Sequence, residues 1–326
     1  MMNKSDLRIV FLGTPDFAVE SLRRIHTEGF NIVGVVTMPD KPAGRGHHLL
    51  QSPVKQYAVA CGLPLLQPVS LKDPEFLAQL KALDANLFVV IAFRMLPREV
   101  WQMPRLGTFN LHASLLPKYR GAAPINWAVI NGDTITGVTT FFLKHEIDTG
   151  DIIAQESISI SPDENVGSVH DRLMTLGADL TVKTLSSIIN GTLTTTSQDA
   201  LVVDIEPTPA PKIFKDTCHI DWRRPAREIH NLVRGLSPYP AAWTTLSDGT
   251  DSTKDLTIKI LKTAVSVHNS SAAPGTITAE RGALRVATAD CDIYILELQP
   301  QGKRPMDIVA FLNGARISPS HSFINP

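Results

Sequence analysis

Apolar runs and amphipathic stretches alternate over the first 190 residues of the chain. The runs at residues 7–12, 32–37 and 86–93 are almost entirely apolar, which is typical of strands covered on both faces of a parallel sheet. Helical spacing of apolar residues separates such runs, most clearly at residues 53–60 and 73–83. This alternation predicts an α/β fold with a Rossmann-like, doubly wound sheet.

The pattern changes beyond a long helix predicted over residues 165–190. Residues 191–211 are rich in Thr and Pro and contain acidic but no basic side chains, which indicates an inter-domain linker. Five short runs with alternating apolar residues follow, at 242–246, 256–261, 275–278, 284–288 and 293–298. Short strands of this kind predict a small OB-like β-barrel. We therefore expect a first domain at 1–190, a linker at 191–211 and a second domain at 212–326.

Length and composition limit the class of protein without deciding its function. The chain has 326 residues, more than the roughly 250–300 at which a single core stops growing, so two domains are expected. Lysine plus arginine total 31 against 32 acidic residues, so the net charge gives no sign of a nucleic-acid partner. The three cysteines are far apart, which argues against a disulfide framework or a zinc site. No apolar run reaches the roughly 18 residues of a membrane span, and we expect a reduced, cytoplasmic compartment.

Three polar residues near strand ends are the strongest candidates for catalysis. Asn110 and His112 lie two positions apart in and just after the apolar run 106–111, and the period of a strand points both side chains to one face. Asp148 follows a second predicted strand, 135–143, and stands beside a glycine turn. If the two strands are neighbours, an amide, an imidazole and a carboxylate converge.

This set of groups suits acyl transfer. The reaction needs a donor for the oxygen that becomes negative, a group that moves a proton near neutral pH, and a charge that holds that group's tautomer. Asn110, His112 and Asp148 can supply these in that order. No Ser or Cys stands in a nucleophile motif such as G-x-S-x-G, so we expect direct transfer between two bound substrates rather than a covalent acyl-enzyme.

Two motifs make the chain recognisable. The string HASLLPKYRGAAPI, which begins at His112, and the string HEIDTGDI, which begins at His145, resemble those of the 10-formyltetrahydrofolate-dependent formyltransferases. The resemblance covers nearly the whole chain and is strongest to the members that formylate the initiator methionyl-tRNA. It implies the formyltransferase fold, 10-formyltetrahydrofolate as the donor without a metal, methionyl-tRNA as the acceptor, and a monomer. It also implies that Asn110, His112 and Asp148 are the catalytic residues.

The resemblance extends to the binding site for the folate. It implies that Ser114, Leu115, Leu116 and Pro117 line the pterin side of that site. In the family a turn that corresponds to residues 92–97 also walls the pocket. Here that turn reads AFRMLP, which lacks the usual glycine and is one residue shorter. Its arginine, at position 94, is open to two interpretations, a surface side chain or a ligand contact.

A polar loop at residues 39–52, PDKPAGRGHHLLQS, is punctuated by Gly and Pro and carries Lys41 and Arg45. From the residues alone it is either a plain surface connection or a basic finger for a phosphate backbone. The resemblance favours the finger, because the family loop is inferred to enter the acceptor end of the tRNA and its Gly-Arg-Gly string matches residues 44–46. We therefore predict that Lys41 and Arg45 bind tRNA.

A local excess of basic residues opens the second domain. Residues 212–234 contain six Lys or Arg against three Asp or Glu. By itself this pattern favours the solvated face of a helix predicted at 225–234, whereas the resemblance implies that the domain at 212–326 binds tRNA.

Two rival functions remain open at this stage. The first is a formyltransferase whose acceptor is an amino sugar nucleotide, glycinamide ribonucleotide or water, because such relatives share the Asn, His and Asp. The second is a non-catalytic RNA-binding protein on the same fold. A small acceptor needs neither the basic loop nor the basic second domain, and a binding module has no use for the catalytic trio. Both features together favour transfer to a tRNA.

Overall fold

The computed structural model describes residues 2–43, 48–201, 207–250, 255–280, 282–315, 317–318 and 320–326. The chain forms two compact units. The first comprises residues 1–124, 136–158 and 170–210, and the second comprises residues 125–135, 159–169 and 211–326. The second unit thus takes two short segments from within the range 1–190 in addition to the C-terminal residues.

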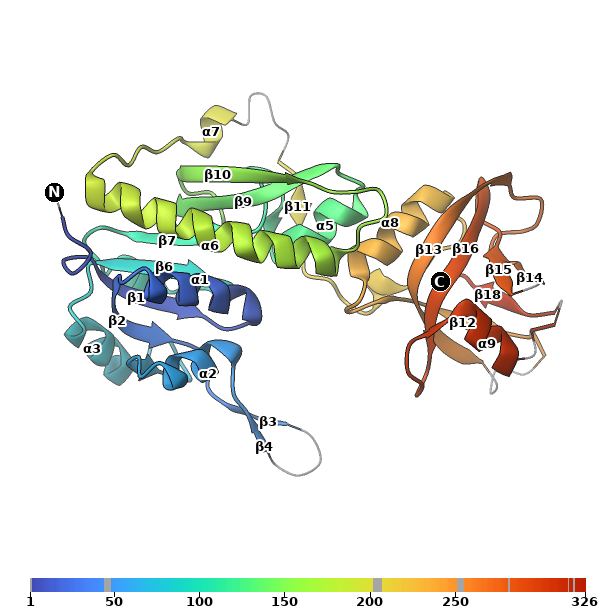
Figure 1. The fold of residues 1–326 in the computed structure, drawn as a ribbon, viewed down its shortest axis with the longest axis horizontal. Helices are drawn as coiled ribbons and strands as arrows, with labels where there is room; N and C mark the ends of the chain where they lie inside the picture. The colour runs from blue at the N-terminus through green and yellow to red at the C-terminus, as the bar shows by residue number, and fades with distance from the viewer. Residues whose placement is uncertain are drawn as a thin grey trace. The chain divides into compact units, whose positions relative to one another are not determined.

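The first unit is built around a seven-stranded sheet. Its strands, in spatial order, are β10 (Ile152–Ser159), β9 (Ile135–Phe142), β7 (Thr108–His112), β6 (Leu87–Ile91), β1 (Arg8–Gly13), β2 (Asn31–Val36) and β5 (Leu65–Leu66) (Figure 1). β1 pairs in parallel with both β2 and β6, and β7 is parallel to β6, whereas β9 runs antiparallel to β7. The chain starts in the middle, builds one side and then the other, which is the Rossmann-like, doubly wound order. The predicted fold class is confirmed.

Helices cover both faces of this sheet because its strands are apolar on both sides. Those that lie mainly in the first unit are α1 (Asp16–Thr27), α2 (Pro53–Ala60), α3 (Pro74–Ala82), α4 (Arg98–Trp101) and α6 (Val166–Asn190). On one face, Val10 of β1 belongs to the same buried cluster as Phe76 of α3. α1 and α6 lie side by side, with the rings of Phe17 and His170 5.3 Å apart.

The parallel strands β1, β6 and β7 end at one edge of the sheet, which we call the carboxyl edge. His112 is the last residue of β7 and therefore lies at this edge. The turn at residues 92–97 follows β6 and lies there too. In doubly wound sheets this edge is where ligands bind, so the fold places the candidate residues where a site is expected.

Residues 39–52, which we expected to be an irregular loop, contain a short antiparallel hairpin. Its strands are β3 (Lys41–Ala43) and β4 (His48–Leu50), with Lys41 opposite Leu50. Figure 1 shows the two strands projecting from the first unit beside α2. Arg45, one of the two predicted tRNA-binding residues, lies outside the residues that the structure describes.

A polar cluster holds the base of this hairpin. The carboxylate of Asp40 accepts hydrogen bonds from Nζ of Lys55 at 2.6 Å and from Nε2 of Gln67 at 2.9 Å. The hydrogen bond from Lys55, followed by that from Gln67, lowers the pKa of Asp40 below its ordinary value. Thr37 and Ser52 also share a hydrogen bond of 2.8 Å. These bonds hold one side of the hairpin base to α2 and to the segment after β5, and the Thr37–Ser52 bond joins its two sides.

The second unit is an antiparallel sheet that curls into a nearly closed barrel. Its strands, in spatial order, are β14 (Ile277–Glu280), β15 (Ala283–Val286), β16 (Cys291–Pro300), β13 (Leu256–Asn269), β12 (Ala242–Ser247) and β18 (Ser322–Ile324), with β17 (Met306–Asp307) beside β16. A bridge between Thr276 and Ser322 joins the two ends of this sheet. The predicted small barrel is confirmed, although β17 and β18 were not predicted.

Helices and a buried tryptophan complete the second unit. The helices are α5 (Pro124–Ile130), α8 (Ala226–Leu236) and α9 (Ile308–Gly314), and a 3-10 turn spans Asp216–Cys218. Trp222 is fully buried, stacks on Phe323 with ring centres 5.2 Å apart, and donates its indole N–H to Oγ1 of Thr244 at 3.0 Å. The satisfied N–H explains why so large a polar-tipped ring is tolerated in the core.

Residues 191–211, which we predicted to be a linker, contain α7 (Gln198–Leu201) and β11 (Pro209–Ala210). β11 pairs in parallel with β8 (Arg120–Gly121), and Thr196 pairs with Ile152. The described parts of this segment are therefore attached to the first unit by backbone hydrogen bonds. This attachment brings them to the candidate site.

Candidate active site at the carboxyl edge of the sheet

His112 ends β7 with a buried side chain, 7% exposed. Its Nε2 lies 2.8 Å from the backbone carbonyl oxygen of Tyr119. A carbonyl only accepts hydrogen bonds, so this contact places a proton on Nε2. The ring of Phe141 meets the imidazole edge-on, with ring centres 6.4 Å apart. Both contacts fix the plane of the ring.

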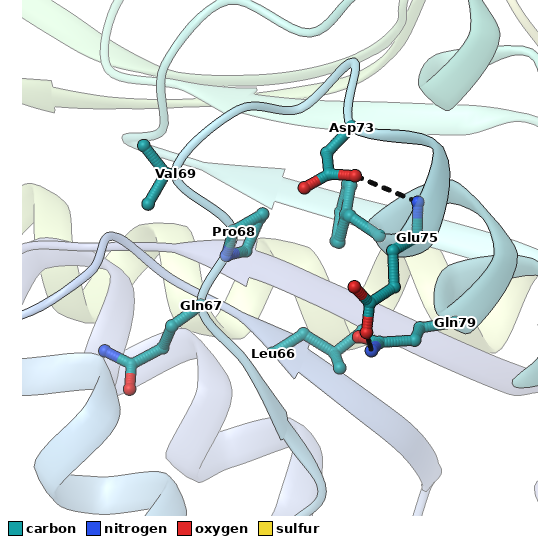
Figure 2. A pocket seen from close by; sticks show the side chains of 8 residues that line it. Leu66, Gln67, Pro68, Val69, Asp73, Glu75 and Gln79 are labelled. Atoms are coloured by element: carbon teal, nitrogen blue, oxygen red, sulfur yellow. Dashed lines mark hydrogen bonds between the residues drawn. The ribbon is translucent and has the colours of Figure 1, made fainter.

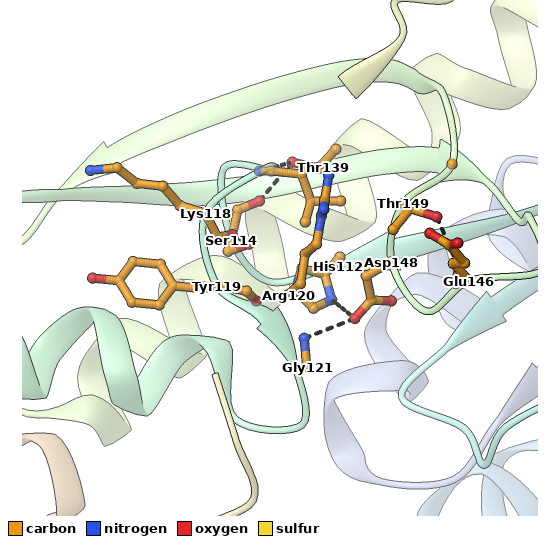
Figure 3. A network of polar contacts seen from close by, with 12 residues as sticks. His112, Ser114, Lys118, Tyr119, Arg120, Gly121, Thr139, Glu146, Asp148 and Thr149 are labelled. Carbon is orange, nitrogen blue, oxygen red and sulfur yellow. Dashed lines mark hydrogen bonds and ion pairs between the residues drawn. The ribbon is translucent and has the colours of Figure 1, made fainter. Parts of the chain in front are cut away.

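Asp148 approaches the other side of the imidazole from the loop that follows β9. Its Oδ2 lies 3.9 Å from Nδ1 of His112 and accepts a hydrogen bond of 2.9 Å from the backbone N–H of Gly121 (Figure 3). The Asp148 side chain is 12% exposed. Its backbone has a φ of 55°, which is uncommon for a residue other than glycine. The carboxylate therefore depends on an unusual loop conformation for its position.

The two ring nitrogens of His112 thus have different surroundings. Nε2–H is used by the Tyr119 carbonyl, whereas Nδ1 is too far from Asp148 for a direct hydrogen bond. The Asp148 carboxylate therefore places a negative charge near Nδ1 without bonding to it. In the imidazolium form, the Nδ1–H is the proton that the ring can offer to a substrate.

Asn110 leaves β7 on the same face as His112, because side chains on a strand repeat every two residues. Its backbone pairs with Phe141 on β9 and with Val90 on β6, so it lies inside the sheet. Its Oδ1 is buried and has no hydrogen-bond partner within the described part of the chain. Buried polar atoms in proteins are nearly always paired, so this oxygen is suited to a group that arrives with a substrate.

The four residues predicted to line the pterin side form a braced turn after His112. Ser114, Leu116 and Pro117 are buried, and Leu115 is half-buried. Oγ1 of Thr139 donates to the carbonyl oxygen of Ser114 at 2.6 Å. The polar groups of the turn are thus largely used within the protein. Contact between these four residues and a folate stays a prediction.

Several residues that hold this site were missing from the sequence interpretation. Tyr119 and Gly121 contribute only backbone atoms, which no side-chain pattern reveals. Gly121 has a φ of 128°, and a Cβ there would meet the carbonyl oxygen of Ala210 at 2.5 Å. Gly150 is equally constrained, because a Cβ would meet the carbonyl oxygen of Phe142 at 1.6 Å. These two glycines were visible in the motifs, and only the structure shows why they are glycines.

A hollow lies near the end of β5 (Figure 2). Its lining residues are Leu66, Gln67, Pro68, Val69, Asp73, Glu75, Phe76 and Gln79. Oδ1 of Asp73 caps α3 by accepting from the Glu75 N–H at 2.9 Å. Arg94, which sequence analysis left open, donates to the carbonyl oxygens of Pro68 and Val69. Arg94 thus braces the wall of this hollow, and burial lowers the pKa of its guanidinium.

Lys41, the other residue predicted to bind tRNA, lies outside this group of residues. Lys41 is exposed at the start of β3 in the projecting hairpin. Over the described residues, no group of three or more His, Cys, Asp or Glu side chains is arranged to hold a metal ion. Over the same ranges, none of the helices combines the length and apolar character that crossing a membrane requires.

Comparison with known proteins places this geometry in context. Residues 7–185 match the family model described as formyl transferase, and residues 212–316 match that of the formyl transferase C-terminal domain. The chain is 53% identical over 318 residues to a methionyl-tRNA formyltransferase of Bacteroides fragilis, covering 97% of this chain and 98% of the relative. It is 56% identical over 318 residues to a methionyl-tRNA formyltransferase of Parabacteroides distasonis, covering 96% of this chain and 97% of the relative.

Among solved structures, the chain is similar to a sugar 3N-formyl transferase crystallised in the presence of dTDP and 5-N-formyl-THF. The TM-score is 0.63 at 19% sequence identity, and the match covers 91% of this chain and 99% of that one. At this level of identity the likeness supports the fold alone.

Proposed function

The chain belongs to the formyl transferase family, and on this premise we propose that it transfers a formyl group from 10-formyltetrahydrofolate to the α-amine of initiator methionyl-tRNA. The acceptor is supported by relatives more than 50% identical over nearly the whole chain that are named methionyl-tRNA formyltransferases. The observation that carries the chemistry is the placement of His112 between the Tyr119 carbonyl and the Asp148 carboxylate.

The acceptor brings its own nucleophile. The α-amine of an aminoacyl ester titrates near or below about pH 8, so a useful neutral fraction exists at neutral pH. The amine nitrogen forms a bond to the formyl carbon, the bond from that carbon to the folate nitrogen breaks, and one proton passes from the amine to the departing nitrogen. No covalent intermediate on the protein is needed, in keeping with the absence of a nucleophile motif.

The role of His112 follows from its two ring nitrogens. With Nε2–H held by Tyr119, a protonated ring presents Nδ1–H as a donor to the formyl oxygen as charge develops there. Asp148 places its negative charge beside the ring without receiving its proton, since Nδ1 and Oδ2 are 3.9 Å apart. His112 or a water gives a proton to the folate nitrogen and takes up the proton that the amine loses, so the net transfer is from the amine to the folate nitrogen.

The role of Asn110 follows from its unpaired oxygen. We assign its amide NH2 to the formyl oxygen, next to His112, and its buried Oδ1 to an N–H of the incoming amine. One side chain then touches both reacting groups and holds them in contact, which lowers the entropic part of the barrier. Ser114, Leu115, Leu116 and Pro117 are assigned to the wall on the pterin side.

The tRNA is assigned to the hairpin and to the second unit. We assign phosphate contacts to Lys41 and Arg45, and the hydrogen bonds of Asp40 to Lys55 and Gln67 hold the base of the hairpin. A rival acceptor, an amino sugar nucleotide or another small amine, would explain Asn110, His112 and Asp148. It would not explain the hairpin. A non-catalytic RNA-binding protein would not explain why His112 lies between the Tyr119 carbonyl and the Asp148 carboxylate.

One set of assays decides among these functions. Formyl transfer is measured side by side to methionyl-tRNA, uncharged tRNA, an amino sugar nucleotide and glycinamide ribonucleotide, with 10-formyltetrahydrofolate as donor. We expect transfer to methionyl-tRNA alone, and a loss of roughly 100-fold or more in kcat for His112→Ala. Preferred transfer to a small amine would show that methionyl-tRNA is not the acceptor. Full activity of His112→Ala would overturn the mechanism.

A further inference from the structure

The segment between the two expected domains contains a buried glutamine that serves the active site. Gln198 begins α7, and its side chain is 1% exposed. Its Nε2 donates to the carbonyl oxygens of Asp148 at 2.9 Å and Gly150 at 2.8 Å. Its Oε1 accepts from Nε and Nη2 of Arg120 at 3.0 Å and 2.7 Å. All four hydrogen-bonding positions of the amide are therefore occupied.

These bonds close a ring around the catalytic carboxylate. Arg120 precedes Gly121, and the Gly121 N–H donates to Oδ2 of Asp148. The Asp148 backbone carbonyl accepts from Nε2 of Gln198. The side chain of Asp148 is thus held by Gly121, next to Arg120, and its main chain by Gln198, which binds Arg120. A shift of Gln198 would move both contacts together.

The loop needs such support because its conformation is unfavourable for its sequence. Asp148 has a φ of 55°, and Gly150 has no space for a side chain. A residue in this backbone region persists only where its surroundings hold it there. Gln198 supplies two hydrogen bonds to this loop from a position 50 residues away along the chain.

We infer that Gln198 is a positioning residue for the catalytic carboxylate, holding Asp148 at its working distance from His112. This inference rests on the proposed function and extends it to the inter-domain segment. Gln198 touches neither reacting group. Gln198 affects catalysis only by positioning Asp148. The inference can therefore be tested by combining substitutions at Gln198 and Asp148.

The experiment compares Gln198→Met with a matched control. Asn86 is a buried amide at the opposite edge of the sheet, where Nδ2 donates to the Asp6 carbonyl at 2.7 Å and Oδ1 accepts from the Arg8 N–H at 2.9 Å. We expect Gln198→Met to lower kcat by roughly 10-fold to 100-fold, with KM for both substrates within about threefold. Asn86→Leu, which loses two buried hydrogen bonds of an amide side chain, should keep the kcat of the wild type. Gln198→Glu keeps the acceptor for Arg120 and serves if Gln198→Met fails to fold.

A double-mutant cycle and an amide exchange measurement complete the test. In the Asp148→Asn background, Gln198→Met should change kcat by less than about twofold, because the carboxylate that Gln198 positions is already missing. Hydrogen exchange at the Gly121 amide should accelerate at least about tenfold in Gln198→Met and not in Asn86→Leu. Wild-type kcat in both Gln198 variants, an additive loss in the cycle, or unchanged exchange at Gly121 would overturn the inference. An inactive wild type would instead refute the proposed function, and the exchange measurement would still decide the role of Gln198.

Discussion

Oδ2 of Asp148 lies 3.9 Å from Nδ1 of His112 and at the same time accepts a hydrogen bond of 2.9 Å from the Gly121 backbone N–H. One oxygen thus connects the imidazole to the main chain of a different loop. On the far side of the ring, Nε2 is held by the Tyr119 carbonyl, two residues before Gly121. Residues 119–121 therefore hold both groups through their main chain. The Tyr119 carbonyl contacts the imidazole on one side, and the Gly121 N–H donates to the carboxylate on the other.

The charge of Asp148 is the first feature to test. Asp148→Asn keeps the size of the side chain and an oxygen for the Gly121 N–H, but it removes the negative charge beside the imidazole. We expect kcat to fall by roughly 100-fold or more, measured in single-turnover transfer to methionyl-tRNA. Asp151→Asn is the control, since that carboxylate pairs with the exposed Lys144 at 2.8 Å. Equal activity of the two variants would contradict the role of Asp148.

The glycine at position 121 should be irreplaceable for a reason that is partly catalytic. In Gly121→Ala the new Cβ would meet the Ala210 carbonyl oxygen at 2.5 Å, which displaces β8 and its N–H from Asp148. Gly62→Ala is the control, because Gly62 has a φ of 66° with no atom near the added Cβ. We expect Gly62→Ala to lose about 1–2 kcal/mol of stability from backbone strain, measured by chemical denaturation, and Gly121→Ala to lose more because of the added clash. Only Gly121→Ala should also lose kcat, by at least roughly 10-fold.

The hairpin should affect the tRNA and spare the folate. We expect Lys41→Ala and Arg45→Ala each to raise KM for methionyl-tRNA and leave KM for the folate unchanged. Each variant should also reduce the slope of log affinity against log salt concentration by about 1, because one phosphate contact is lost. The exposed Lys72 provides a control substitution to Ala. An unchanged slope would exclude phosphate contact at the substituted residue.

Acidification should destabilise the second unit through His230. Its imidazole is 3% exposed, and burial lowers its pKa below the ordinary 6.5 although Asp163 lies 3.4 Å away. The unfolded chain therefore takes up the proton at a higher pH than the folded chain, and the free energy of unfolding falls as the pH drops below about 6.5. We expect Tm to decrease between about pH 7.5 and about pH 5.5, and to decrease less in His230→Gln. An exposed-site control, His268→Gln, should behave as the wild type.

The stack of Trp222 on Phe323 should dominate the stability of the barrel. Trp222→Leu removes a fully buried ring and leaves Oγ1 of Thr244 without its indole donor. We expect a loss of roughly 3–5 kcal/mol in the free energy of unfolding of the second unit, measured by denaturant titration. Tyr239→Leu, at a position 80% exposed, should cost far less. Similar losses in the two variants would mean that the ring is not central to this core.

The sequence by itself determined most strands and helices of the sheet and the barrel and the candidates for catalysis, but not the hairpin at 39–52, α7, β11, β17 or β18. Strand period placed Asn110 and His112 on one face, and a glycine turn after the next predicted strand marked Asp148. These features are local, because hydrophobic period and turn chemistry act over a few residues. The doubly wound sheet and the barrel followed from the order of such elements.

Only the tertiary structure decided which groups hold the candidates. The Arg120 to Gln198 contact joins residues 78 positions apart, and the Tyr119 and Gly121 contacts use backbone atoms that carry no side-chain signature. Residues 191–211 have the composition of a linker, yet hydrogen bonds of their described part attach them to β8 and to the loop of Asp148. Composition indicates the local conformation of a segment. The partner that pairs with a buried amide depends on which distant residues the fold brings next to it.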